Sequence, residues 1–170
     1  IIEEFNYHNS KGNADAAQAS LQEAIKKDPR NPIFHYSIGA TFDELANTRH
    51  EEGKHDEARL YVDKAVEAYS KSIELDPKFA DAYYNLGVLY NNESFSLTNE
   101  MQSIEDVKLL EAKSKESREL LKKAIPYLEK SNELTPTDVN TLKLLKSIYF
   151  TIEDMDNYNV VAEKLKTLGQ

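Results

Sequence analysis

The stretch "SIELDPKFADAYYNLGVLY", residues 72–90, joins two helical patterns across a proline. Apolar residues recur at helical spacing up to Leu75, and the pattern stops at Pro77 because proline cannot continue a helix. A new amphipathic pattern then begins. The same punctuation recurs in "AIKKDPRNP" (24–32) and "SNELTPTDV" (131–139), so the sequence predicts successive helices joined by short turns.

Composition supports a helical protein and argues against several classes of function. The 170 residues are 40% hydrophobic and 30% charged, with only 5 Gly and 5 Pro, few for an all-β chain. A net charge of −9 argues against a nucleic-acid surface, which needs clustered Lys and Arg. No apolar run is long enough to span a bilayer. The chain has no cysteine, which excludes disulfides and Cys-based metal sites.

Residues 81–90 resemble the first helix of a tetratricopeptide repeat. That family's pattern has an aromatic residue, Leu-Gly and a second aromatic, then Ala in the second helix and a closing Pro, within about 34 residues. The matches here are Tyr83, Leu86, Gly87, Tyr90, Ala124 and Pro136, preceded by a similar set at Ile38, Gly39, Phe42, Ala65 and Pro77. A last unit matches at Leu142, Leu145 and Tyr149, but Lys146 replaces the glycine and Tyr158 falls where a small residue is usual.

The resemblance implies an all-α fold, a right-handed superhelical solenoid of about three and a half helix pairs. It predicts a single domain over residues 1–170 with units at about 1–29, 30–77, 78–136 and 137–168. The first unit is short, because residues 12–29 resemble a second helix whose partner is cut to about nine residues. The opening "IIEEFNYHNS" starts in a helical pattern without an initiator Met, so we expect a fragment of a longer protein.

Two of the units are too long for the family pattern. Phe42 and Ala65 are 23 residues apart, against about nine in the pattern. Gly53 divides the excess into one heptad per arm, which keeps the apolar face in phase and predicts a single helix from about Asp56 to Leu75. The next unit gains about 25 residues, and its turn should fall within residues 98–106. Such stretched hairpins resemble those of bacterial members of the family.

The long arms allow two hypotheses. They are spacers that shape the solenoid, or the projecting hairpin near residues 91–115 is itself a docking or oligomer contact.

Motifs for catalysis or metal binding are missing from the sequence. The four histidines lack the two-His spacing of a helical zinc site, although His50 and His55 flank the turn at Gly53 and could approach each other. His35 takes a core position of its helix. The paired carboxylates fall at predicted turns and helix starts, where acids favour the helix dipole. We therefore predict no catalytic residue, no metal and no cofactor, and a protein that is not an enzyme.

In this family, the first helix of each pair lines a groove for a peptide or a partner helix. Carried over by position, the groove residues are Ile33, Tyr36, Ala40, Asp43, Asp81, Tyr84, Val88, Asn91, Lys143 and Ser147, with Asn140 and Phe150 beside the last two. Tyr36 and Tyr84 are the strongest candidates, because exposed tyrosine combines apolar area with a hydroxyl group. The alternative is that both tyrosines pack between units.

The sequence thus predicts a non-catalytic adaptor that binds a protein or peptide, with no nucleic-acid partner. The alternative function is a structural module that forms a weak homo-oligomer through its terminal helices or the hairpin near 91–115. The sequence leaves a cytoplasmic and a bacterial exported or periplasmic location equally open.

Overall fold

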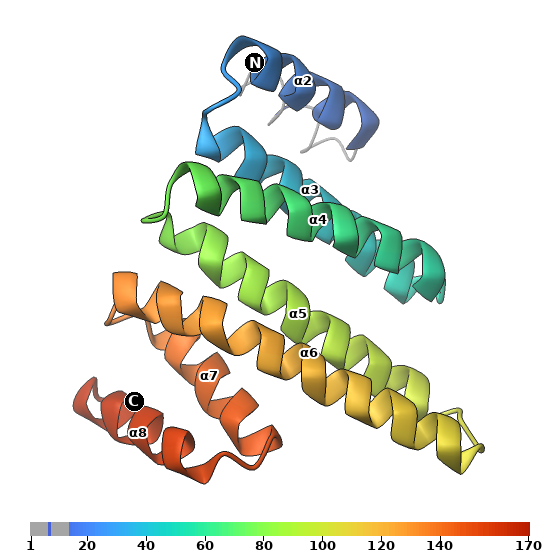
Figure 1. The fold of residues 1–170 in the computed structure, drawn as a ribbon, viewed down its shortest axis with the longest axis vertical. Helices are drawn as coiled ribbons and strands as arrows, with labels where there is room; N and C mark the ends of the chain where they lie inside the picture. Colours follow the sequence, from blue (N-terminus) through green and yellow to red (C-terminus); the bar gives the residue numbers. More distant parts are fainter. Residues whose placement is uncertain (1–6, 8–13) are drawn as a thin grey trace. The chain divides into compact units, whose positions relative to one another are not determined.

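The computed structural model describes Tyr7 and residues 14–170, and the part of the chain it describes is helical and contains no strand (Figure 1). The chain divides into two compact units, one up to Ala82 and one from Tyr83 to Gln170. This confirms the predicted all-α fold class. None of the helices described is long and apolar enough to cross a membrane.

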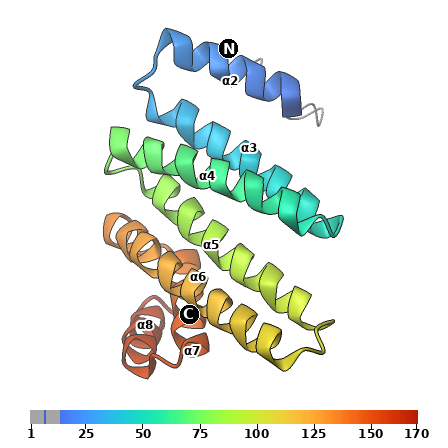
Figure 2. The ribbon, with the colours of Figure 1, turned by 45° about the vertical axis from the view of Figure 1, so that its right-hand side comes forward.

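The first unit contains α2 (Ala14–Lys27), α3 (Pro32–Glu51) and α4 (His55–Leu75), which lie side by side in Figures 1 and 2. Helix α3 begins with Asn31 as its N-cap, whose side chain accepts a hydrogen bond from the Ile33 N–H, and with a proline at its first position. The turn to α4 uses Gly53 at φ 74°, a left-handed conformation that suits glycine. The single helix predicted from about Asp56 to Leu75 is confirmed.

The buried stripe of α4 follows alternating steps of four and three residues. Its members are Ala58, Val62, Ala65, Tyr69 and Ser72, all of them buried. Opposite Tyr69 stands Gly39 of α3, and a Cβ atom there would lie 2.6 Å from Cδ1 of the Tyr69 ring. Because Gly39 has no side chain, the Tyr69 ring can pack closely against the backbone of α3.

The second unit contains most of α5 (Ala80–Met101), then α6 (Val107–Leu134), α7 (Val139–Thr151) and α8 (Met155–Thr167). The turn between α5 and α6 lies inside the predicted range 98–106. Asp106 is the N-cap of α6, and its side chain accepts hydrogen bonds from the N–H groups of Lys108 and Leu109. Pro126 lies within α6.

The same arrangement recurs between α5 and α6. The buried stripe of α6 repeats the steps of four and three with Ser117, Leu121, Ala124, Leu128 and Ser131. A Cβ atom on Gly87 would lie 2.5 Å from Cγ of Leu128. Glycine on the first helix thus faces a large buried residue on the second in both lengthened pairs. The α6 stripe joins α7 and α8 in a core of Leu121, Ala124, Leu128, Leu142, Leu145, Ile148, Tyr149, Val161 and Leu165.

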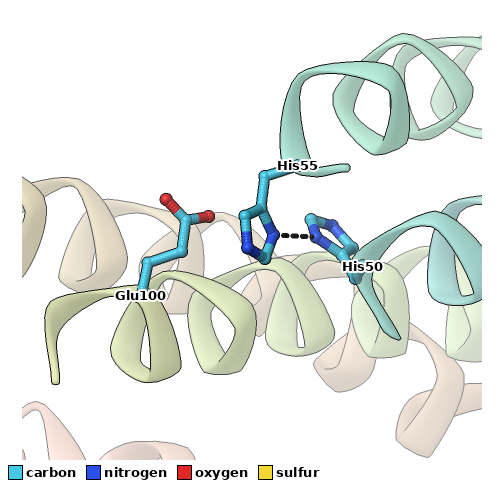
Figure 3. Close-up of side chains that lie close together, drawn as sticks. All are labelled: His50, His55 and Glu100. Atoms are coloured by element: carbon cyan, nitrogen blue, oxygen red, sulfur yellow. Dashed lines mark hydrogen bonds between the residues drawn. The ribbon is translucent and has the colours of Figure 1, made fainter. Parts of the chain in front are cut away.

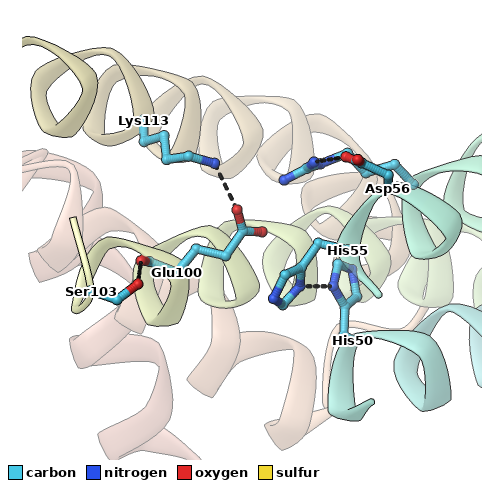
Figure 4. Close-up of polar contacts among 7 residues, drawn as sticks. His50, His55, Asp56, Glu100, Ser103 and Lys113 are labelled. Carbon is cyan, nitrogen blue, oxygen red and sulfur yellow. Dashed lines mark hydrogen bonds and ion pairs between the residues drawn. The ribbon is translucent and has the colours of Figure 1, made fainter. Parts of the chain in front are cut away.

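The far half of the α5–α6 hairpin is held by polar contacts. The Ser94 and Ser117 hydroxyls are 2.7 Å apart and buried. Nearer the turn, Lys113 Nζ donates to Glu100 Oε2 at 2.6 Å, and Ser103 donates to the Glu100 carbonyl (Figure 4). The hairpin also outreaches its neighbours in the second unit, because α5 and α6 have 22 and 28 residues while α7 and α8 have 13 each.

Candidate functional site

The groove residues expected in the first unit lie mostly on α3. Ile33 is 51% exposed, and Asp81 at the start of α5 is also exposed. Ala40 and Asp43 are half-buried. Tyr36 is half-buried as well, with its ring 5.8 Å from that of Tyr69 and 5.0 Å from that of Phe79. Tyr36 therefore contributes to helix packing and keeps only part of its surface for a partner.

In the second unit, Tyr84 is likewise packed on one side and exposed on the other. It packs against the core formed by α6, α7 and α8, and it is half-buried. Burial raises the pKa of the Tyr84 hydroxyl, and the nearby negative charge of Asp138 raises it further. Val88 and Asn91 on the same helix are half-buried. A phenol that stays protonated can donate a hydrogen bond throughout the physiological pH range.

Lys143, Ser147 and Phe150 lie along α7 and line a cavity of about 480 Å³. The other wall comes from α8 and includes Tyr158 and Lys166. Lys143 is exposed, and its Nζ donates to Oε1 of Gln170 at 3.2 Å. The second unit thus brings the Lys143 and Ser147 side chains to one cavity, with aromatic surface beside them.

Two departures from the repeat pattern meet in this cavity. Nζ of Lys146, which stands where the family has glycine, lies 5.4 Å from the centroid of the Tyr158 ring. The Tyr158 ring, in the place of a small residue, is also 5.8 Å from the Phe150 ring. A cation over an aromatic face is attractive. Both departures from the repeat pattern are visible in the sequence. The groove positions predicted from the family pattern nevertheless did not include Lys146, Tyr158 or Lys166.

His50 and His55 face each other across the Gly53 turn (Figure 3). Their Nδ1 atoms are 3.0 Å apart, at hydrogen-bonding distance, so the predicted approach is confirmed. One ring donates a hydrogen bond and the other accepts it, and the pair thereby joins the end of α3 to the start of α4. Two imidazoles supply half of the four ligands of a structural zinc site. His35 instead contacts the Pro29 carbonyl through Nε2 at 3.2 Å.

The entry to α7 is fixed by Asp138, beside Tyr84. Its carboxylate accepts hydrogen bonds from the N–H groups of Asn140 and Thr141 and from the Thr141 hydroxyl. Partial burial opposes the charge of Asp138, but these hydrogen bonds outweigh it and hold the pKa of Asp138 below its usual value. At the other end of α7, burial and a hydrogen bond to Glu129 raise the pKa of Tyr149.

The lowered pKa of Asp138 makes the stability of the second unit depend on acidity. The stabilisation is fully present above the unfolded-state pKa of about 3.9 and is lost as pH falls through the lower folded-state value. We expect Asp138→Ala to lower the free energy of unfolding by about 1 kcal/mol at pH 7. Asp138→Asn, which keeps the cap but cannot titrate, should lose less stability than the wild type on acidification below about pH 4. Urea titrations at several pH values measure both, and a wild-type-to-Asn difference that is the same at every pH would contradict this account.

Two protein-family models match the sequence of these helix pairs. A family model described as "Tetratricopeptide repeat" matches residues 3–73, and one described as "TPR repeat" matches residues 62–92. Together the two matches run from residue 3 to residue 92, more than half of the chain. The chain belongs to the tetratricopeptide repeat family. The tetratricopeptide family is one of protein-interaction modules, and this membership supports a role in protein interaction.

Curated relatives of this tetratricopeptide repeat chain match only part of it. Photosystem I assembly protein Ycf3 of Synechococcus sp. (strain WH7803) is 32% identical over 68 residues, 40% of this chain and 39% of that protein. Tetratricopeptide repeat protein 37 of Xenopus laevis is 32% identical over 79 residues, 46% of this chain and 4% of that protein. The matches therefore span less than half of either relative.

Solved structures similar to this tetratricopeptide repeat chain include two helical-repeat proteins. The crystal structure of MamA protein is 18% identical, covers 98% of this chain and 87% of its own, and has a TM-score of 0.44. A tetratricopeptide repeat protein from Parabacteroides merdae is 19% identical, with 98% and 77% covered and a TM-score of 0.30. The fold assignment rests on the helices of the structure and on the family match.

Proposed function

We infer that this chain is a non-catalytic adaptor that binds a protein or peptide through side chains of α3, α5 and α7. Family membership supports an interaction role, and the relative Ycf3 is named for the assembly of photosystem I. The observation that carries the proposal furthest is the cavity between α7 and α8, lined by Lys143, Ser147 and Phe150. Tyr84 in the second unit and Tyr36 in the first are proposed as further contact residues, each considered within its own unit.

The cavity suits a peptide that carries a carboxylate next to an apolar side chain. Lys143 and Lys146 place two ammonium groups at the cavity, beside Lys166, which pairs with Glu163, in a chain whose net charge is −9. A local positive site on an acidic protein selects acidic partners and disfavours basic ones. The rings of Phe150, which is 63% exposed, and Tyr158 offer the apolar contact.

Selection from a displayed library of short random peptides tests this proposal and does not require an identified partner. Enriched peptides should carry Asp or Glu beside a large apolar residue. Fluorescence anisotropy should show that Lys143→Ala and Phe150→Ala each weaken the binding of such a peptide by about tenfold. Lys130→Ala on α6 and Val160→Ala on α8, which replace a cation and an exposed apolar residue outside the cavity, are matched controls.

Substitutions to phenylalanine rather than to alanine test the two tyrosines, because each ring packs within its own unit. Tyr36→Phe and Tyr84→Phe keep that packing and remove only the hydroxyl groups. Weaker peptide binding with unchanged circular dichroism would support their place in the contact surface. Selected peptides without carboxylates, or equal binding by Lys143→Ala and Lys130→Ala, would defeat the α7–α8 assignment.

A further inference from the structure

The histidine pair at the α3–α4 turn offers a different kind of binding site, within the first unit. The Nδ1 atoms of His50 and His55 are 3.0 Å apart (Figure 3). Their ring centroids are 5.4 Å apart, and the ring planes are tilted by 38°. Both side chains are half-buried, while Glu52, Gly53 and Lys54 in the turn between them are exposed, so solvent and small ions reach the pair.

The backbone of the turn fixes the positions from which the two imidazoles project. The Gly53 N–H donates to the His50 carbonyl at 3.0 Å. The Lys54 N–H donates to the Arg49 carbonyl at 2.8 Å. Together with the left-handed conformation of Gly53, these two bonds form a Schellman motif, which ends a helix in a defined geometry. Helix α4 then begins at His55. The approach of the two histidines is therefore set by the backbone as well as by their own contact.

The separation of the two Nδ1 atoms matches that of two ligands on one metal ion. Imidazole nitrogen binds a divalent ion such as Zn²⁺ at about 2.0–2.1 Å. Two bonds of that length across 3.0 Å enclose an angle of about 91–97° at the ion. This angle is close to the roughly 90° of square-planar and tetragonal coordination, which is typical of Cu²⁺ and Ni²⁺, and smaller than the roughly 109° of tetrahedral zinc.

The hydrogen bond between the rings prepares them for a shared ion. The accepting ring already directs an Nδ1 lone pair toward its partner. A metal ion takes the place of the proton between the two nitrogens. That proton is released to solvent or moves through solvent to Nε2 of the same ring, and both imidazoles then bind through Nδ1. Metal binding thus replaces one link between α3 and α4 with another.

Charged neighbours at the turn are paired with one another and add little to the affinity for a cation. Their ion pairs are Arg49 with Glu52 and Glu57, Lys54 with Glu52, and Arg59 with Asp56. Selectivity therefore comes from the two nitrogen ligands. Imidazole suits late first-row metals, whereas Ca²⁺ and Mg²⁺ are hard cations that bind oxygen.

We propose that His50 and His55 chelate one divalent transition metal ion through their Nδ1 atoms, with Cu²⁺ preferred over Zn²⁺. Water fills the remaining coordination positions, because the pair supplies only two ligands. The bound ion holds the end of α3 to the start of α4 and stabilises the first unit. The sequence search for metal ligands considered two histidines on one helix, whereas these two come from different helices. The site shares no residue with the proposed peptide contact.

Isothermal titration of the whole chain with CuCl₂, ZnCl₂ and CaCl₂ tests the site. We expect one tightly bound Cu²⁺ per chain, weaker binding of Zn²⁺ and no binding of Ca²⁺. His50→Gln and His55→Gln should each weaken Cu²⁺ binding by about tenfold or more, because each removes one of the two ligands. His35→Gln is the matched control, since it removes an imidazole of the same unit that contacts the Pro29 carbonyl instead, and it should leave binding unchanged.

Nuclear magnetic resonance of the Zn²⁺ form shows which nitrogen atoms bind, because Zn²⁺ is a d¹⁰ ion without unpaired electrons. The ¹⁵N signals of two histidine rings should move to values typical of metal-bound Nδ1, and His50→Gln should abolish both changes. Coordination through Nε2 of either ring, or changes confined to His8 and His35, would overturn the proposal.

Bound metal should also protect the turn that it spans. Saturating Zn²⁺ should slow hydrogen exchange in residues 49–58, and the thermal midpoint should rise with ion concentration, with both effects lost in His55→Gln. Equal Cu²⁺ affinity in His50→Gln and His35→Gln, or equal protection by Ca²⁺, would overturn the proposal. Ion-dependent dimers in light scattering would place the two ligands on different chains and would also overturn it.

Discussion

Replacing Tyr69 by alanine is expected to lower the free energy of unfolding of the first unit by about 3–5 kcal/mol, as for other large aromatic residues in cores. The ring is completely buried on α4, against Gly39 of α3 and 5.8 Å from the Tyr36 ring. The glycine has no side chain that could move into the space left behind, so the cavity should stay largely open. Urea denaturation followed by circular dichroism measures the loss.

Tyr69→Phe is the matched control, because it keeps the ring and should cost about 1 kcal/mol or less. Hydrogen exchange read by mass spectrometry locates the effect, which should appear as faster exchange in α3 and α4. A loss for Tyr69→Ala below about 1 kcal/mol, or faster exchange confined to α7 and α8, would contradict the role assigned to this ring.

The second large effect concerns Gly87 and Leu128, the corresponding pair in the second unit. Leu128→Ala should lower the free energy of unfolding by about 2–5 kcal/mol, because the side chain is fully buried. Gly87→Ala should also destabilise, by about 1–3 kcal/mol, although helix propensity alone favours alanine by about 1 kcal/mol. The clash decides the sign, since the new Cβ atom would lie 2.5 Å from Leu128 Cγ.

The double variant separates these two contributions. With Leu128 already replaced by alanine, the Gly87→Ala change no longer meets a side chain and should become neutral or stabilising, so the two losses are far from additive. Gly87→Ala with Leu145→Ala is the control, because Leu145 belongs to the same core but is not among the nearest atoms to Gly87. A coupling between Gly87 and Leu128 below about 0.5 kcal/mol would contradict the close approach.

The helices were predictable because their determinants are local in sequence. Apolar spacing and the flanking Gly53 and Pro77 placed α4 within a residue of its observed start and at its observed end. The turn between α5 and α6 was predicted for the same reason. The division of the chain into repeat units and the use of the ten groove residues stay predictions.

The candidate sites depend on contacts between distant parts of the sequence, which periodicity does not encode. The partial burial of Tyr36 depends on Tyr69 and Phe79, which come from other segments of the first unit. Met101 of α5 and Leu110 of α6 line a cavity that depends on how the two helices pair rather than on the pattern of either one. The Lys146–Tyr158 contact was visible only as two separate departures from the family pattern.

The heptad lengthening of the hairpins has a geometric consequence for their growth. Seven residues fall about 20° short of two full turns of a straight α-helix, so every inserted heptad rotates the buried stripe by that amount. The pair must take up the rotation as a left-handed supercoil if Ala58 and Ser72, two heptads apart, are both to stay buried as they are. Longer arms therefore demand more coiling. The supercoil therefore turns the tip of a hairpin relative to its base by an angle that grows with each heptad added.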